Sequence, residues 1–212
     1  MPLFKIRQSP YQWEEVVDIV RSNKLERFAR SGPDSEKYLK FKKQVVSDPQ
    51  MSVFKYLLIN QLQWAQSETA RQLDDSQIVI KPKSTMLFVE PSDVKILKND
   101  FPYNFAEGIH HLCVWTKFKI PVDPLSPIGD ISADTRTVIE RYLKKTFCEK
   151  YGIKWENLLW FKNWESLQSV KAMSHIHVII QGVDEATVKS MLYTSGVCLT
   201  KEESSMEATV VC

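Results

Sequence analysis

The hydrophobic pattern of the chain changes near residue 85, and this change constrains the fold more than any other feature. Before it, apolar residues recur with the 3.6-residue period of amphipathic helices, as in YQWEEVVDIVRSNKLERFAR (11–30). After it, short runs rich in β-branched and aromatic residues alternate with Pro, Asp and Gly. The sequence therefore predicts an α+β fold, with N-terminal helices packed on an antiparallel sheet.

The expected elements follow from these two hydrophobic patterns. Residues 1–66 should form a helical layer, and residues 66–84 a polar connector. One long helix is expected over 134–151, between a Ser/Asp-rich start and a Gly stop, and a short last helix over 183–193. The strand-like runs are MLFVE (86–90), VKIL (94–97), IHHLCVWTKFKI (109–120), NLLWFKNW (157–164) and MSHIHVIIQG (173–182).

The chain is expected to form a single domain over 1–195, followed by a loosely ordered tail over 196–212. The tail is polar around KEESS, and chain ends of this composition are often poorly ordered. The connector at 66–84 is no stronger a boundary than a loop.

Composition and charge exclude several classes of function. The formal net charge is +2 and the basic residues are scattered, so no nucleic-acid partner is expected. No stretch approaches the roughly 18 to 20 apolar residues of a membrane span, so no membrane partner is expected either. Four cysteines without a CxxC spacing, behind a start that lacks a long apolar segment, indicate reduced thiols. We therefore expect a cytoplasmic protein, with the nucleus as a second location.

The four histidines occur in two tight pairs, His110 with His111 and His175 with His177. Side chains alternate between the two faces of a strand, so in SHIHVIIQ both histidines share one face at roughly 6 to 7 Å spacing. The other face is purely aliphatic and should be the core side. Adjacent His110 and His111 must point to opposite faces.

Two other interpretations of this HxH pattern stand beside a catalytic one. Surface or hydrogen-bonded histidines on an ordinary strand are common, and HxH spacing also suits two zinc ligands on one face. A zinc site needs a third ligand, and no Cys, Asp or Glu stands at a compelling spacing. We therefore expect no resident metal or cofactor. P-loop, GxGxxG, GxSxG and HExxH motifs are also absent from the sequence.

The residues around the histidine pairs resemble the histidine-triad superfamily over residues 85–182. Asn163, Gln168 and Ser169 precede the paired histidines in NLLWFKNWESLQSVKAMSHIHVII, which is the order found in that superfamily's active-site strand. The stretch NDFPYNFAEGIHHLCVWTK resembles its earlier strand, in which an Asp-x-x-Pro loop leads into a Gly-His strand ending in Lys, here Lys117. The resemblance implies a histidine-triad-like sheet with one long helix between these strands.

Over most of its length the chain also resembles a eukaryotic family typified by the fungal N-acetylglucosamine-induced protein. The stretches PSDVKILKNDFPY, GIHHLCVWTK and LLWFKNWESLQSV…HIHV carry this likeness. It implies a soluble intracellular protein linked to the amino-sugar response, and it supplies no reaction.

The histidine-triad resemblance implies chemistry at phosphorus. In that superfamily the middle histidine attacks the α-phosphorus of a nucleotide, and the residue two places later makes a polar contact. This sequence has two histidines where the superfamily has three. With His175 as nucleophile, His177 is its polar partner and Met173 replaces the first histidine; with His177 as nucleophile, Ile179 could make no such contact. The first register keeps the chemistry.

The remaining candidate residues are ligand contacts. Asn163, Gln168 and Ser169 are candidates for phosphate or ribose, although each could instead satisfy loop backbone. His110 is the member of the first pair assigned to the site. Lys117 could attract a phosphate, although a solvated role is common for single lysines. Trp164, between polar neighbours, could stack on a base or sugar.

Three hypotheses follow. The first is a nucleotidyl or phosphoryl transferase or hydrolase that acts on a phosphate or nucleotide-sugar ligand through His175. The second is a non-catalytic nucleotide- or sugar-phosphate-binding or regulatory protein on a degenerate histidine-triad fold. The third is a metal-dependent enzyme with His175 and His177 as ligands. Histidine-triad proteins often dimerise, so the resemblance also allows a homodimer.

Overall fold

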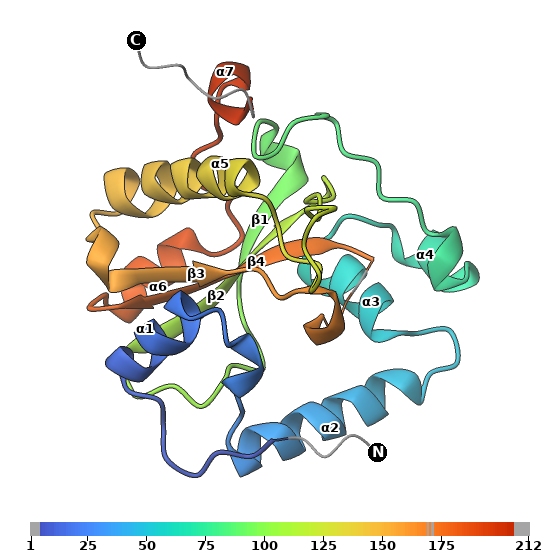
Figure 1. Cartoon of the computed structure of the whole chain (residues 1–212). Coiled ribbons are helices and arrows are strands. Elements are labelled where there is room, and N and C mark those ends of the chain that lie inside the picture. Colours follow the sequence, from blue (N-terminus) through green and yellow to red (C-terminus); the bar gives the residue numbers. More distant parts are fainter. Residues whose placement is uncertain (1–4, 169, 171, 206–212) are drawn as a thin grey trace. The chain divides into compact units, whose positions relative to one another are not determined.

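The chain folds into helices and one four-stranded sheet, which confirms the predicted α+β class (Figure 1). The computed structural model describes residues 5–168, 170 and 172–205, without the side chain of Glu165. Contacts divide the chain into two compact units, residues up to 80 together with 99–111, and residues 81–98 together with 112 onward. The single domain expected over 1–195 stays a prediction.

The first unit is mainly helical, as the N-terminal periodicity predicts. Its elements are α1 (Trp13–Arg21), η1 (Leu25–Arg27), α2 (Gly32–Val46), α3 (Val53–Tyr56) with its π-helical continuation η2 (Leu57–Gln61), α4 (Ser67–Gln72) and η3 (Asp75–Gln77). The last two lie inside the segment expected to be a connector without regular structure. Ser31 caps α2 by accepting a hydrogen bond from the Asp34 N–H.

Aromatic side chains hold the loop 99–111 within this unit. The Tyr103 ring stacks on Phe28 with centroids 4.8 Å apart, and Phe101 packs on Phe41 at 4.9 Å. The Tyr11 hydroxyl donates to the Arg27 carbonyl at 2.6 Å. Aromatic pairs of this kind stabilise beyond the area they bury, so this loop is part of the unit's core.

The second unit is built on the sheet, whose strand order is β1-β2-β4-β3. The strands are β1 (Val94–Lys98), β2 (Ile109–Thr116), β3 (Leu158–Phe161) and β4 (Ser174–Gln181). In the antiparallel pair of β3 with β4, Phe161 lies opposite His177. In that of β1 with β2, Leu97 lies opposite Cys113.

Helices complete the second unit. They are η4 (Pro91–Asp93), α5 (Ala133–Leu143) with its π-helical continuation η5 (Lys144–Lys150), η6 (Trp155–Asn157), η7 (Glu165–Leu167), α6 (Glu185–Met191) and α7 (Lys201–Ser204). The long helix and the short last helix predicted from the sequence correspond to α5 with η5 and to α6.

The aliphatic face of β4 lies in the main core, as predicted. Ile176, Val178 and Ile180 belong to one buried cluster with the α5 residues Val138 and Ile139. Figure 1 shows α5 running alongside the sheet. Burial of so many large side chains on one face fixes the register of β4, because a one-residue shift would turn the histidines toward α5.

Two expectations about local structure are wrong. The run MLFVE is not a strand: Leu87 and Phe88 are core residues, but Phe88 has φ +61°, which an extended strand does not allow. The start of the tail is not loose: Leu199 is buried, and the Ser204 hydroxyl donates to the Leu87 carbonyl at 2.6 Å. Residues 206–212 of the expected tail lie outside the described residues.

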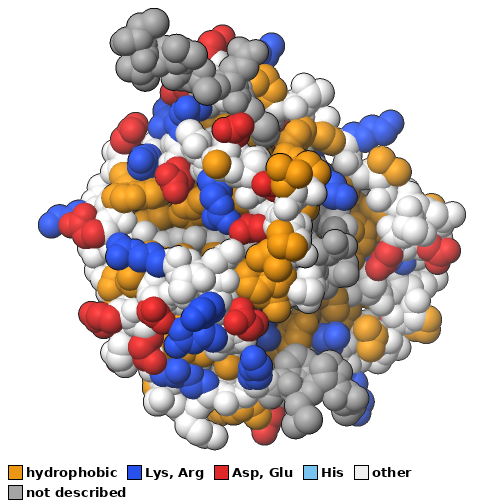
Figure 2. All heavy atoms as spheres, in the orientation of Figure 1, with side chains coloured by type: hydrophobic (Ala, Val, Ile, Leu, Met, Phe, Trp, Pro, Cys, Tyr) orange, Lys and Arg blue, Asp and Glu red, His pale blue; other side chains and the backbone are white. Residues whose placement is uncertain are grey.

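The surface matches the near-neutral charge. Basic and acidic side chains are interspersed over the face drawn in Figure 2 rather than separated by sign. Among the helices of the described ranges, none combines the length and apolar composition that a bilayer crossing requires.

Candidate functional site

His175 and His177 project from the face of β4 opposite the aliphatic core, and that face is covered as well. The two side chains are 8% and 5% exposed, and six consecutive residues of β4 are buried. An ordinary solvent-facing strand, one of the alternatives for the HxH pattern, does not fit this burial. Buried imidazoles need partners, so their contacts decide what the face can do.

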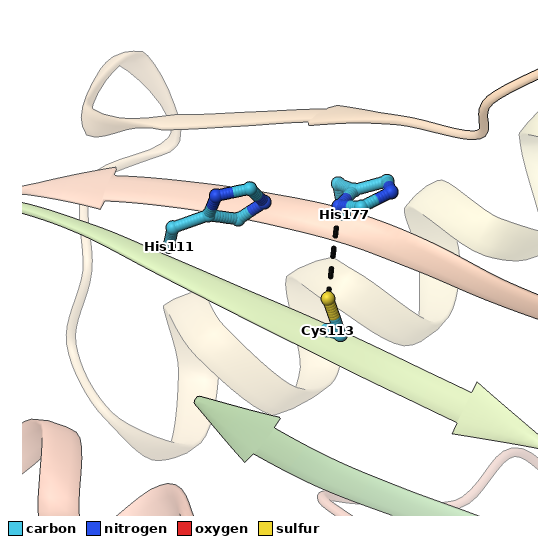
Figure 3. Close-up of side chains that lie close together, drawn as sticks. All are labelled: His111, Cys113 and His177. Atoms are coloured by element: carbon cyan, nitrogen blue, oxygen red, sulfur yellow. Dashed lines mark hydrogen bonds between the residues drawn. The ribbon is translucent and has the colours of Figure 1, made fainter. Parts of the chain in front are cut away.

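His177 is held on three sides. Its ring stacks on Phe161, the residue opposite it in β3, with centroids 4.7 Å apart and planes 17° apart. Its Nε2 lies 3.1 Å from Nδ2 of Asn163, and its Nδ1 lies 3.6 Å from the Cys113 sulfur. Figure 3 shows Cys113 and His177 facing each other from β2 and β4, with His111 two residues before Cys113 on the same strand.

His175 is packed but keeps one ring nitrogen without a hydrogen bond. The Trp115 indole stacks on it with centroids 4.1 Å apart, and the His177 ring stands at 72° to it at 4.9 Å. Its Nδ1 is buried and has no hydrogen-bond partner among the described residues.

Burial sets the protonation state of His175. Burial lowers the pKa of this imidazole most, the positive charge of nearby Lys162 lowers it as well, and a hydrogen bond with the Met173 backbone offsets part of the effect, so that the pKa lies at about 4. His175 is therefore neutral at physiological pH, with a lone pair on one ring nitrogen.

Asn163 connects the loop after β3 to the histidine face. The residue is 6% exposed, and its backbone carbonyl accepts a hydrogen bond from the Gln168 side chain at 2.8 Å. Its Oδ1 is buried and has no hydrogen-bond partner. Only four such side-chain atoms occur in the described residues, and two of them, Asn163 Oδ1 and His175 Nδ1, lie in this cluster. A buried polar atom without a hydrogen bond costs about 1 to 3 kcal/mol.

The structure brings together part of the predicted site. His175, His177, Asn163 and Gln168 lie on or beside the histidine face, as the contacts above show. Ser169 lies outside the described residues.

Three predicted residues are placed differently. Lys117 pairs with Asp93, with Nζ and Oδ1 3.6 Å apart. Alternation along β2 places His110 on the face of Leu112, opposite that of Cys113. Trp164 is only partly buried, and the described contacts do not join its indole to the histidines. The ligand roles of these three residues stay predictions without support from the geometry.

Sequence reasoning missed Cys113 and Phe161 as neighbours of the histidines, and expected Trp115 in the core. Cys113 and Trp115 alternate with Leu112 and Val114 in a continuous apolar strand, so nothing local separates them from core residues. The available signal was that Cys113 and Trp115 share one face of a strand in the same sheet as SHIHVII.

Among the described residues, one group of side chains could hold a metal ion. It consists of Cys113 and His177, together with His111 two residues earlier on β2. Thiolate sulfur and imidazole nitrogen are ligands that zinc prefers. The set differs from the predicted one, because His175 is not part of it.

Comparison with known proteins places the chain in a family. The family described as a protein of unknown function, DUF3605, matches residues 12–181. The chain belongs to the DUF3605 family. N-acetylglucosamine-induced protein 1 of Candida albicans is 45% identical over 187 residues, which cover 86% of this chain and 73% of the relative. This confirms the predicted resemblance to the N-acetylglucosamine-induced protein family.

Two further comparisons show similarity over most of the chain. An uncharacterized protein of Saccharomyces cerevisiae is 29% identical over 170 residues, covering 80% of this chain and 78% of that protein. The crystal structure of HTC1 has a TM-score of 0.66 at 26% identity, covering 89% of this chain and all of that one. The histidine-triad-like character of the DUF3605 sheet stays a prediction.

Proposed function

We propose that the protein binds a phosphorylated sugar or nucleotide sugar at the histidine face and transfers or hydrolyses the phosphoryl or nucleotidyl group through His175. The observation that carries the proposal is the buried Nδ1 of His175, for which no described residue is a hydrogen-bond partner. A neutral imidazole with an available lone pair is a nucleophile near pH 7.

Charge near His175 supports an anionic ligand. Lys162 is 7% exposed and close enough to His175 to lower its pKa. A positive charge in a site with little water attracts phosphate strongly, and it offsets charge that develops on phosphoryl oxygens during transfer.

The second unfilled atom supports a sugar. Asn163 Oδ1 accepts hydrogen bonds and has no donor. A sugar hydroxyl or an acetamido N–H would supply one. Because a 45% identical relative is named N-acetylglucosamine-induced protein 1, we propose an amino-sugar derivative as ligand and a link to the N-acetylglucosamine response.

The test is an intact-mass measurement after incubation with UDP-N-acetylglucosamine or N-acetylglucosamine 1-phosphate. We expect an acid-labile phosphoryl or nucleotidyl adduct that maps to His175 and is lost in His175→Asn. The matched control is His110→Asn, which changes a histidine on the opposite face of β2 and should keep the adduct. An adduct that survives His175→Asn would assign the nucleophile elsewhere.

A second candidate function is binding without turnover. The two positions that a third histidine would occupy hold Met173 and Ile179, both buried and apolar. A protein of this kind would be stabilised by UDP-N-acetylglucosamine without consuming it, since a ligand that binds only the folded state raises its stability. A rise in melting temperature that His175→Asn removes, with no product over hours, would favour this function.

The metal-dependent alternative is tested by metal analysis of the purified protein, with stoichiometric zinc as the supporting result. The predicted ligand pair gives it little support, because His175 is not part of the group that contains Cys113 and His177. The cytoplasmic or nuclear location and the homodimer stay predictions.

A further inference from the structure

Cys113, His177 and Asn163 lie in contact in that order, and the phosphoryl transfer proposed through His175 makes no use of Cys113. The Cys113 sulfur lies 3.6 Å from Nδ1 of His177, and Asn163 lies 3.1 Å from Nε2 on the other side of the same ring. Cys113 carries a thiol rather than a disulfide. All three side chains are at most 6% exposed.

We propose that these three residues are a thiol–imidazole–amide catalytic triad for acyl transfer, with Cys113 as nucleophile, His177 as general base and Asn163 as the residue that orients the imidazole. Cys-His-Asn is one of the arrangements that recur on unrelated folds, and it is recognised by geometry and role rather than by sequence position. This activity is separate from the proposed phosphoryl chemistry.

The Asn163 amide decides which tautomer His177 adopts. With Nδ2 toward the ring, as in the structure, Nε2 accepts and the ring proton lies on Nδ1, pointing at the sulfur. With the amide turned by 180°, Oδ1 accepts from Nε2–H and the Nδ1 lone pair faces the thiol. The second orientation makes His177 a base for Cys113, and Asn163 Oδ1 then accepts from Nε2–H when no sugar donor occupies it.

The reaction balances without a redox partner. The Cys113 thiol proton moves to Nδ1 of His177 while the sulfur attacks an ester carbonyl carbon, and the carbonyl π pair moves to oxygen. Collapse of this adduct expels the alcohol oxygen, which takes the proton from Nδ1 and leaves a thioester on Cys113. Water then adds to the thioester carbonyl and gives one proton to Nδ1 of His177. The carbon–sulfur bond breaks, and the Cys113 sulfur takes that proton from Nδ1, which yields the acid and the intact thiol.

Aromatic rings lie next to the triad. The Phe161 ring stacks on His177, and the Trp115 ring stacks on His175 beside it, so the neighbours of the triad are flat and largely apolar. Such walls exclude water, which strengthens the electrostatic interactions within the triad. We therefore assign small esters and thioesters of acetyl size as the substrate class.

The test uses p-nitrophenyl acetate with the full-length protein and maps the acetylated cysteine by peptide mass. We expect acetyl transfer to Cys113, turnover after the first equivalent, and loss of both in Cys113→Ala. Cys148 and Cys198 are internal standards, because they are more exposed than Cys113 and burial raises the pKa of both thiols. Faster acetylation of either standard than of Cys113 in the wild-type protein would overturn the proposal without any variant.

Variants of the triad separate catalysis from packing. His177→Gln should slow acetylation of Cys113 by about 100-fold, the lower range for loss of a general base. The carboxylate introduced by Asn163→Asp can only accept a hydrogen bond, so it keeps the imidazole proton on Nε2 and should raise the rate of Cys113 acetylation. Asn163→Leu removes the acceptor and should lower that rate. If both His177→Gln and Asn163→Leu acetylate Cys113 within twofold of the wild-type rate, the contact between Cys113 and His177 serves packing alone.

The acyl and phosphoryl proposals fail independently. The acetyl group sits on Cys113 and the phosphoryl or nucleotidyl group on His175, so one peptide map distinguishes them. His175→Asn should abolish the phosphoryl or nucleotidyl adduct, and Cys113→Ala should abolish the acetyl adduct.

Discussion

Gly196 is a position where even the small change to alanine should lower the stability of the fold strongly. It has φ +69°, and a Cβ added there would lie 2.6 Å from the Tyr142 hydroxyl and 2.6 Å from the Thr146 hydroxyl. We expect Gly196→Ala to lower the free energy of unfolding by about 3 kcal/mol, from backbone strain and overpacking together, measured by urea denaturation.

Gly152 provides the matched control for this prediction. It has φ +70°, but a Cβ there meets nothing within 4 Å. Gly152→Ala should therefore cost about 1 kcal/mol, the backbone part alone. Equal losses in the two variants would show that Tyr142 and Thr146 move aside.

Residues 195–199 show why single positions are hard to place from sequence. The Tyr142 hydroxyl donates to the Ser195 carbonyl at 2.9 Å, and the Val197 N–H donates to the Thr146 hydroxyl at 2.9 Å. These partners lie about fifty residues away in the chain, so the local polar composition predicted a loose tail instead. The site residue Cys113 was missed for the same reason, because its partner His177 lies on another strand.

Among the elements, α5 depends on a defined N-terminal cap. The Ser132 hydroxyl accepts from the Thr135 N–H at 3.2 Å and donates to the Thr135 hydroxyl at 3.1 Å. Ser132→Ala should cost about 1 kcal/mol in unfolding free energy. Ser132→Asp keeps the acceptor and suits the positive end of the helix, so it should retain most of the stability. If Ser132→Asp lowers the unfolding free energy as much as Ser132→Ala does, the cap contributes little to stability.

Elements with strong periodicity were predictable, and their pairing was not. Alternation in SHIHVIIQ correctly placed Ile176 and Val178 in the core, because one face of that strand has no polar side chain. MLFVE has the composition of a strand, yet its Phe88 stacks on Tyr142 at 4.1 Å from a left-handed backbone conformation. Tertiary packing therefore overrode local preference there.

For the whole molecule, stability should fall as the pH falls below 6.5. The pKa of His175 is lowered from 6.5 to about 4, so between these values the unfolded chain binds a proton that the folded one does not. Above pH 6.5 both states are neutral and this group contributes no pH dependence. The loss should reach about 3 kcal/mol near pH 4. Exposed carboxyls with lowered pKa, such as Glu15 and Asp184, add smaller losses at the acid end.

His175→Gln is the variant that checks this slope. It removes the titrating group, so urea unfolding at pH 7 and pH 5 should differ less than in the wild type. An unchanged slope would move the pH dependence to other groups.

The order of the chain does not follow its compact units, and this limits what any sequence can indicate at this scale. Residues 99–111 belong with the N-terminal helices, although they lie between β1 and the rest of β2. The change in hydrophobic pattern near residue 85 therefore indicates where the sheet-containing unit begins. It does not indicate that residues 99–111 belong to the first unit. The family resemblance was recognisable because it depends on residue order alone.

The stack of Trp115 on His175 has a practical consequence. At a centroid separation of 4.1 Å, an imidazolium would quench the emission of the indole, whereas a neutral imidazole would do so far less. The fluorescence difference between the wild type and Trp115→Phe should therefore isolate one indole among the six tryptophans. That signal would make the pair an intrinsic optical sensor of protonation and of ligand arrival at His175.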